Sequence, residues 1–126
     1  MVFTDGSVYD GAVRCGACAA VLVPILANNV KHSSVKAIGK KVSSVTCELE
    51  GIILGLELVL HYFMCSSNRQ SKETLYILCD CSVATDVMMY KLAPTRQGDI
   101  FQRLCYIEDA LSNINVDIIL SWISRN

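Results

Sequence analysis

Close to its start the chain reads Phe3-Thr4-Asp5-Gly6-Ser7, an apolar, β-prone segment that leads into a single carboxylate. The glycine and the hydroxyl that follow are residues that favour a bend in the backbone. We therefore predict a strand over residues 2–8 whose apolar part ends at Asp5 and leaves this carboxylate exposed. Two other acids stand in comparable settings: Glu48 near the start of an apolar helix and Asp80 at the end of an apolar strand.

Two further strands are predicted after the first. Residues 13–23 form an apolar, β-prone run, and the Asp-Gly pair in Tyr9-Asp10-Gly11-Ala12 indicates a hairpin between the two strands. A third run, at about 30–43, mixes valine and isoleucine with four lysines, Lys31, Lys36, Lys40 and Lys41. Such lysines are typical of an exposed edge strand that is protected from aggregation. A dedicated phosphate-binding patch is the alternative interpretation.

From Thr46 to Met64 the hydrophobic period changes to that of a helix. One broad apolar face consists of Leu49, Ile52, Ile53, Leu56, Val59, Leu60 and Phe63. The polar residues Glu50, Glu57 and His61 gather on the opposite side, so we expect them to face away from any site that Glu48 helps to form.

Glu48 itself lies at the margin of the apolar face, one turn before Ile52. Gly51 and Gly55 are its neighbours and would let the helix lie close to a sheet, because glycine has no side chain to hold the backbones apart. This arrangement would hold the Glu48 carboxylate over the end of the sheet.

The second half of the chain alternates strands and helices. After the polar loop Ser66–Thr74 the predicted elements are a strand Leu75–Cys79, a helix of about Ser82–Leu92, a helix of about Gly98–Asn113 and a strand Val116–Trp122. The nearly continuous apolar run of the first of these strands predicts cover on both faces. The whole order predicts one α/β domain over 1–126, with a five-stranded mixed sheet of three antiparallel strands and then two parallel ones, flanked by helices.

The three acids are predicted to meet at one edge of this sheet. Asp5 and Asp80 end the first and fourth strands, and function in open α/β sheets gathers at the carboxyl ends of the strands. Converging carboxylates repel one another unless a cation neutralises them, and their hard oxygen atoms suit Mg²⁺ or Mn²⁺. For each acid taken alone, a solvated surface carboxylate is the ordinary alternative.

Composition argues against a membrane protein. Hydrophobic residues make up 52% of the 126 residues, and the mean hydropathy is +0.40. However, the longest apolar run, 16–27, is broken by Pro24, and the run 51–65 carries Glu57 and His61. Both runs are shorter than the roughly 20 residues that a spanning helix needs. We therefore interpret both as buried core and expect no membrane partner.

Charge and cysteine content restrict partners and compartment. The net charge is −1 and the isoelectric point about 6.1, so no overall positive field attracts a nucleic acid. The seven cysteines lack the paired spacing of a disulfide framework or a zinc ribbon. Buried free thiols in a reducing compartment explain them better, which predicts an intracellular protein, cytoplasmic or nuclear.

Four segments resemble, in order and spacing, the landmarks of type-1 ribonuclease H domains of the retroelement, reverse-transcriptase-associated kind. They are Thr4–Ser7, Thr46–Leu49 ahead of Ile53–Glu57, Leu78–Cys81 and Ile118–Ile123. The resemblance covers nearly the whole chain. It implies a ribonuclease H-like three-layer fold and a metal-dependent endonuclease that cleaves the RNA strand of RNA–DNA hybrids.

The resemblance also implies roles for individual residues. Asp5, Glu48 and Asp80 would be catalytic and, with Gly6, would hold two Mg²⁺ or Mn²⁺ ions, Asp5 bridging both. Gly6, Ser7, Cys81 and Ser82 would lie along the nucleic acid, although Cys81 stands where the family commonly has a serine. The implied partners are an RNA–DNA hybrid and a reverse transcriptase, fused or associated.

The chain departs from the family pattern at both ends. Only Met1 to Thr4 precede Asp5, and the sequence stops at Asn126, before the fourth aspartate and the terminal helix that family members carry. We therefore expect a truncated domain that lacks the C-terminal helix and exposes an apolar, self-associating patch, while Trp122 stays covered. Catalysis would be impaired. A catalytically inactive module for hybrid binding or packing, and an unrelated α/β protein with solvated acids, remain the alternatives.

Overall fold

The computed structural model describes residues 1–11, 14–23, 31–40, 42–64, 72–90 and 98–124. Its elements are β1 (Val2–Asp10), β2 (Arg14–Leu22), β3 (His32–Lys40), α1 (Ser44–Met64), β4 (Glu73–Cys79), α2 (Ser82–Tyr90), α3 (Gly98–Asn113) and β5 (Val116–Trp122). Every predicted helix and strand is present. Most of the predicted loop 66–74, residues 12 and 13 of the first hairpin and the predicted helix end at 91–92 lie outside the described residues.

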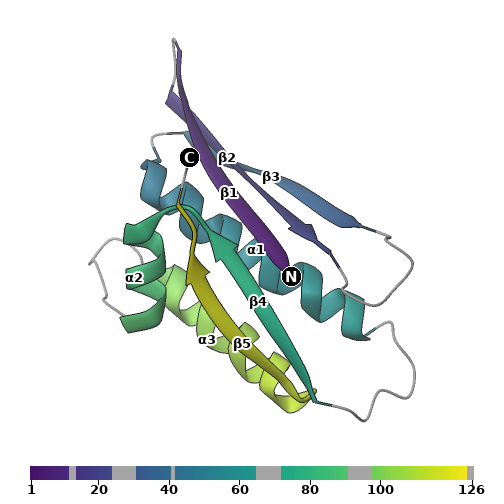
Figure 1. Cartoon of the computed structure of the whole chain (residues 1–126). Helices are drawn as coiled ribbons and strands as arrows, with labels where there is room; N and C mark the ends of the chain where they lie inside the picture. Colours follow the sequence, from purple (N-terminus) through teal and green to yellow (C-terminus); the bar gives the residue numbers. More distant parts are fainter. Residues whose placement is uncertain (12–13, 24–30, 41, 65–71, 91–97, 125–126) are drawn as a thin grey trace.

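The five strands form one mixed sheet in the order β3-β2-β1-β4-β5 (Figure 1). β1 pairs antiparallel with β2, and β2 antiparallel with β3. The pairs β1–β4 and β4–β5 are parallel, because α1 and then α2 with α3 return the chain to the starting end of the sheet between these strands. The predicted sheet is confirmed, and the lysine-bearing β3 is an edge strand.

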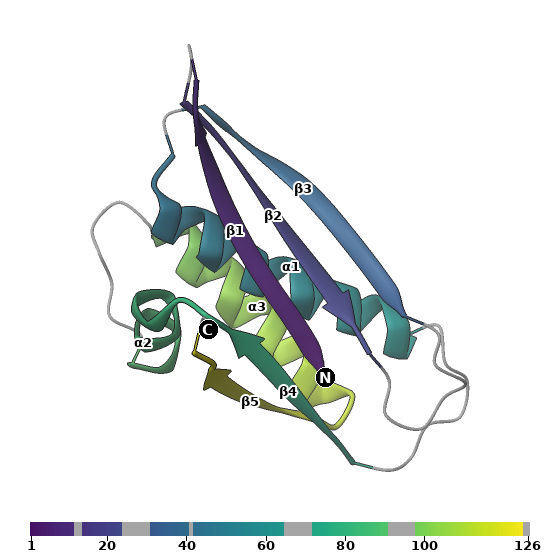
Figure 2. The same ribbon diagram turned by 45° about the horizontal axis from the view of Figure 1, so that its top comes forward.

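The helices lie together on one face of the sheet (Figures 1 and 2). α1 lies against β1 and β2, whereas α3 packs beside α1 and next to β5. The largest fully buried side chains lie between these layers and are Leu49, Ile52, Ile53, Leu56, Ile77, Leu104 and Leu111. Within the described residues no helix combines the length and apolar character that a membrane span requires.

The close approach of α1 to β1 depends on its glycines, as expected. A Cβ added at Gly55 would lie 2.8 Å from Val2 Cγ1 and 3.0 Å from Thr4 Cγ2. At Gly51 it would lie 3.1 Å from the carbonyl oxygen of Asp5. Larger residues here would push α1 away from the strand that carries Asp5.

The outer face of the sheet is apolar and has no helix over it within the described residues. Phe3, Tyr76 and Ile119 are 40%, 41% and 44% exposed, and Tyr76 and Ile119 are direct partners across β4 and β5. The prediction that β4 is covered on both faces is therefore wrong for these residues. Its apolar run reflects one buried face and one apolar outer face, and the self-association that such a patch favours stays a prediction.

Trp122 was expected to be covered, and this expectation is wrong. The residue lies at the last position of β5 and is 53% exposed. Its indole N–H donates a hydrogen bond to the backbone carbonyl of Asp80 at 3.2 Å. A tryptophan needs a partner for this polar group, and here the partner lies at the end of β4 rather than in the core.

The six cysteines within the described residues are free thiols. Cys18, Cys47 and Cys79 are buried, whereas Cys15 and Cys105 are exposed. The interpretation as free thiols is confirmed for these six cysteines. The expectation that they are buried holds only for Cys18, Cys47 and Cys79. The compartment inferred from the cysteines stays a prediction.

Candidate metal centre

Two of the three acids stand where two neighbouring strands part. The parallel pairing of β1 with β4 runs from Val2 opposite Ile77 to Thr4 opposite Cys79 and then ends. The next residue on each strand is an aspartate, Asp5 on β1 and Asp80 after β4. Their carboxylates therefore meet at the opening between the two strands.

The predicted strand end at Asp5 is wrong. Gly6 and Ser7 do not bend the chain away but stay in β1, opposite Cys18 and Ala17 of β2. The position of Asp5 is decided by the end of pairing with β4 rather than by a turn. β1 stays paired with β2 through Asp10, but its pairing with β4 ends at Thr4. Nothing in the local sequence of β1 marks the point where the second pairing ends.

The third acid comes from the first turns of α1. Glu48 is only 5% exposed, and its Oε2 accepts a hydrogen bond from the Gly6 amide at 3.1 Å. Gly6 permits this contact because a Cβ at that position would overlap the Cys47 carbonyl group and lie 2.5 Å from the Glu48 amide nitrogen. Gly6 thus positions Glu48 by its backbone and by its lack of a side chain.

All three acids converge. One carboxylate oxygen each of Asp5, Glu48 and Asp80 lies within 4.8 Å of the others, with Asp5 exposed, Asp80 half-buried and Glu48 buried. Negative charges this close repel one another strongly, and a divalent cation relieves the repulsion. Three oxygen donors without a histidine or thiolate in the group suit Mg²⁺ or Mn²⁺ better than Zn²⁺. The residues present therefore fit the cations expected from the sequence.

Two thiols border the acids without joining them. Cys79 Sγ lies 4.0 Å from Glu48 Oε2 and donates toward it. Burial raises the pKa of the Cys79 thiol, so the sulfur keeps its proton and is a poor metal ligand.

Cys81 acts mainly as a helix cap. Its Sγ accepts a hydrogen bond from the Ala84 amide at 3.4 Å, and its carbonyl accepts one from the Thr85 hydroxyl at 2.9 Å. These contacts begin α2, a position where serine is common for the same reason. Ser7 and Ser82 are exposed. The expected contacts of Ser7, Cys81 and Ser82 with nucleic acid stay predictions.

Glu50 lies outside the acidic group, as expected, but it is buried rather than solvent-facing. It is 8% exposed and accepts two hydrogen bonds from Arg103 of α3, at 2.6 and 2.8 Å. Lys36 of β3 lies 3.6 Å away, and Arg103 also approaches Glu57 at 4.0 Å. The side of α1 that carries Glu50 therefore contacts both α3 and the edge strand β3, which the helical period could not reveal.

Burial alone would raise the pKa of the Glu50 carboxyl. The hydrogen bonds and charge of Arg103, together with Lys36, outweigh burial and hold this pKa below its usual range. A carboxyl with a lowered pKa in the folded state stabilises the fold above its unfolded-state pKa. That stabilisation is lost as the pH falls through the folded-state value.

Replacing Arg103 with methionine should lower the free energy of unfolding by about 3 kcal/mol near neutral pH, because Glu50 would stay buried without its bidentate partner. The difference from the parent should shrink at acid pH, because a Glu50 carboxyl that has taken up a proton no longer needs a cationic partner. Urea unfolding followed by circular dichroism at both pH values measures it.

The matched control is Lys72→Met, which breaks the ion pair with Asp117 at 2.9 Å between side chains that are 61% and 59% exposed. This pair should be worth less than about 1 kcal/mol. Equal losses in the two variants, or a loss for Arg103→Met that is the same at both pH values, would contradict a stabilising role for the buried pair.

The fold and the acids together define a mixed α/β domain with a group of three carboxylates that fits a divalent cation, at the parting of the parallel strands β1 and β4. No protein-family model matches the chain, and no curated protein matches it. Comparison with solved structures does identify the fold, which is ribonuclease H-like.

Three of these structures show the extent of the likeness. LC11-RNase H1, isolated from compost and solved in complex with an RNA/DNA hybrid, superposes with a TM-score of 0.72 at 18% identity, over 98% of this chain and 84% of its own. RNase H1 of Halobacterium salinarum gives 0.68 at 14% identity, over 98% and 84%. The protease–reverse transcriptase of prototype foamy virus gives 0.66 at 8% identity, over 98% of this chain and 17% of its own.

Proposed function

We propose that this chain is a divalent-cation-dependent nuclease that cleaves the RNA strand of RNA–DNA hybrids. The observation that carries the proposal is the convergence of Asp5, Glu48 and Asp80 within 4.8 Å at the opening between β1 and β4. The ribonuclease H-like fold supports it, and one of the similar structures, LC11-RNase H1, holds an RNA/DNA hybrid.

In this proposal the three carboxylates would hold two Mg²⁺ or Mn²⁺ ions. Such ions activate a water for attack on a phosphodiester and stabilise the leaving oxygen. Asp5, the exposed member, would be a cation ligand, while the Gly6 amide fixes the orientation of buried Glu48. Ser7, Cys81 and Ser82 border the opening and contact the RNA strand, whose 2′-hydroxyls distinguish it from DNA.

Affinity for the hybrid is expected to come largely from outside this chain. A net charge of −1 provides little attraction for phosphates. We propose that a reverse transcriptase, fused to or associated with the chain, holds the substrate. The likeness to part of the foamy virus protease–reverse transcriptase supports this arrangement.

A hybrid-binding module without catalysis is the second candidate. It is favoured by the number of ligands, since three carboxylates gather within the described residues where the family resemblance implies four. With fewer protein ligands, more coordination positions fall to water, and the cations bind weakly.

We expect slow cleavage of a labelled RNA–DNA hybrid in Mg²⁺ and several-fold faster cleavage in Mn²⁺. Mg²⁺ demands near-ideal octahedral geometry, whereas Mn²⁺ accepts less regular coordination. Gel analysis of time courses at matched cation concentrations measures the ratio. A double-stranded RNA of the same sequence and a reaction with excess chelator are the controls.

The outcomes separate the candidates. Cleavage of the hybrid that requires the cation supports the nuclease, and binding of the hybrid without cleavage in either cation supports the binding module. Cleavage that persists in chelator, or that is equal on double-stranded RNA, would overturn the proposed activity.

A further inference from the structure

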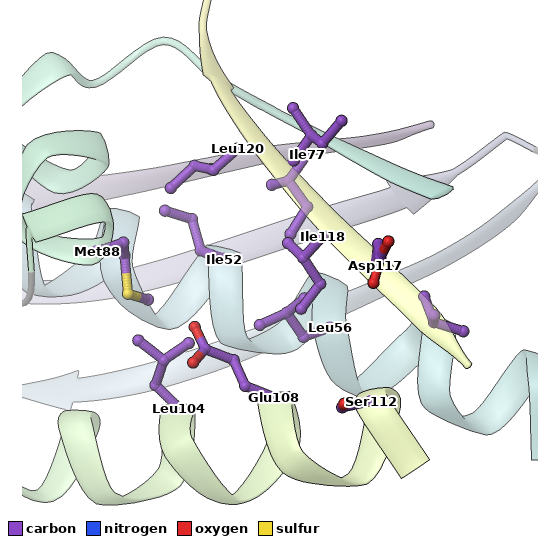
Figure 3. A pocket seen from close by; sticks show the side chains of 12 residues that line it. Ile52, Leu56, Ile77, Met88, Leu104, Glu108, Ser112, Asp117, Ile118 and Leu120 are labelled. Carbon is purple, nitrogen blue, oxygen red and sulfur yellow. The ribbon is translucent and has the colours of Figure 1, made fainter. Parts of the chain in front are cut away.

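Trp122, the only tryptophan of the chain, is not placed by packing alone. Ile118 and Leu120 point from β5 toward the helices (Figure 3) and are partly buried. Trp122 is next in this alternation, at the last position of β5, but it is 53% exposed. Tryptophan is highly buried on average, so a role in the core does not explain this position. Its polar contact is with the backbone of Asp80.

Two hydrogen bonds from the end of β5 reach the backbone around Asp80. The Ile123 amide donates to the Cys79 carbonyl at 2.9 Å, and the Trp122 indole N–H donates to the Asp80 carbonyl at 3.2 Å. These carbonyl groups lie on either side of the Asp80 α-carbon. Because the backbone has only two soft dihedrals at each residue, fixing both carbonyl groups restricts the direction in which the Asp80 side chain leaves the backbone.

Asp80 has to be held from the β5 side of the sheet. The pairing of β4 with β1 ends at Cys79 opposite Thr4. The pairing of β4 with β5 also reaches Cys79, opposite Trp122, and the two hydrogen bonds from β5 extend this contact past the end of the strand. The parting of β1 from β4 makes room for the acids, and at Asp80 it leaves β5 as the neighbouring strand.

The other two acids are held by different groups. Asp5 lies within β1, which stays paired with β2 at this position. The Glu48 carboxylate accepts a hydrogen bond from the Gly6 amide. Asp80 directly follows the last residue of β4, and the Trp122 indole provides the contact that corresponds to these two.

We propose that Trp122 is a positioning residue, whose indole N–H holds the Asp80 backbone so that the Asp80 carboxylate meets those of Asp5 and Glu48. The inference rests on the proposed function, because it requires these acids to bind a divalent cation. Groups that orient metal ligands without touching the metal tune its affinity. Loss of one neutral hydrogen bond should weaken cation binding about five-fold.

The single tryptophan makes a test by isosteres possible, because replacing tryptophan throughout the chain changes Trp122 alone. Benzothienylalanine has the shape of tryptophan with sulfur in place of the indole N–H, whereas 7-azatryptophan keeps the N–H. Calorimetric titration of the full chain should show Mn²⁺ binding about five-fold weaker with benzothienylalanine, and within about two-fold of the parent with 7-azatryptophan.

Cleavage of the RNA–DNA hybrid gives a second readout. At a fixed, subsaturating Mn²⁺ concentration, kcat should fall by up to about five-fold with benzothienylalanine. The KM for the hybrid should stay unchanged, because the ring keeps its shape and place. The 7-azatryptophan form should keep the parent kcat.

Three variants complete the design. Asp80→Asn should lose most of the Mn²⁺ affinity, which identifies the titrated site. Tyr76→Phe, which alters an exposed aromatic residue on the same strand β4, should bind Mn²⁺ as the parent does. Trp122→Phe keeps an aromatic ring without the donor and decides the matter if the benzothienylalanine form does not fold, as judged by circular dichroism.

The outcomes separate this inference from the proposed function. Equal Mn²⁺ affinity with and without the indole N–H, or an unchanged affinity with a raised KM, would overturn the positioning role and leave the nuclease standing. Weaker Mn²⁺ binding without the N–H, in a chain whose parent form does not cleave the hybrid, would support the positioning role and refute the nuclease. A parent chain that binds no Mn²⁺ would overturn both.

Discussion

Replacing Asp5 with asparagine should abolish cleavage of the RNA–DNA hybrid, with a loss of at least about 100-fold, or about 3 kcal/mol of transition-state stabilisation. Asparagine keeps the shape of the side chain but removes the negative charge with which Asp5 would hold a cation. Asp5 is also the exposed member of the acidic group, so the substitution should leave the fold intact. Initial rates in Mn²⁺, where the parent is expected to be fastest, give the widest range for the comparison.

Glu57→Gln is the matched control. Glu57 is an acid on the same helix as Glu48, but it approaches Arg103 and is 47% exposed. Its variant should cleave within about two-fold of the parent, because surface substitutions away from a site have small effects. Equal activity of the parent and Asp5→Asn would show that the observed cleavage comes from a contaminating nuclease or from other chemistry.

Replacing Gly6 with alanine should lower the free energy of unfolding by about 3 kcal/mol, because the added methyl group overlaps the backbone of Cys47 and Glu48. Backbone atoms at the start of a helix cannot move aside as the end of a flexible side chain can. To relieve the overlap, α1 would have to shift away from β1 and carry Glu48 with it. Urea unfolding measures the loss of stability, and Mn²⁺ titration should show weaker binding in the folded fraction.

Ser7→Ala serves as the comparison, since Ser7 is the next residue on β1 and its side chain is exposed. Its effect on stability should stay within about 0.5 kcal/mol. A Gly6→Ala variant as stable as the parent would show that α1 does not approach β1 as closely as the structure places it. That result would also remove the physical basis for the position of Glu48.

Local patterns were sufficient to predict the helices and strands. The period of two in 116–122 and the helical period in 98–113 match β5 and α3 residue for residue. α1 begins at Ser44, two residues before the predicted start, because the Ser43 hydroxyl accepts a hydrogen bond from the Thr46 amide at 3.1 Å and caps the helix. Its first residues carry no apolar period, so periodicity alone could not locate this end.

The three acids could be predicted because each interrupts an apolar segment, and that contrast is visible in the chain itself. Asp80 directly follows a buried strand, and Glu48 lies at the margin of a buried face with Gly51 beside it. Convergence at one point then required only that the first and fourth strands be neighbours, as they are. The sequence by itself thus determined the fold class and the candidate site.

Only the tertiary structure decided what lies opposite each surface. The pairing of Glu50 with Arg103 joins residues 53 positions apart, and the exposure of Tyr76 follows from the absence of a helix over the outer face within the described residues. Likewise, Asp5 owes its position to the parting of β1 from β4. Periodicity reports which side of an element is apolar, but not which element covers that side or how closely, because those depend on contacts between distant parts of the chain.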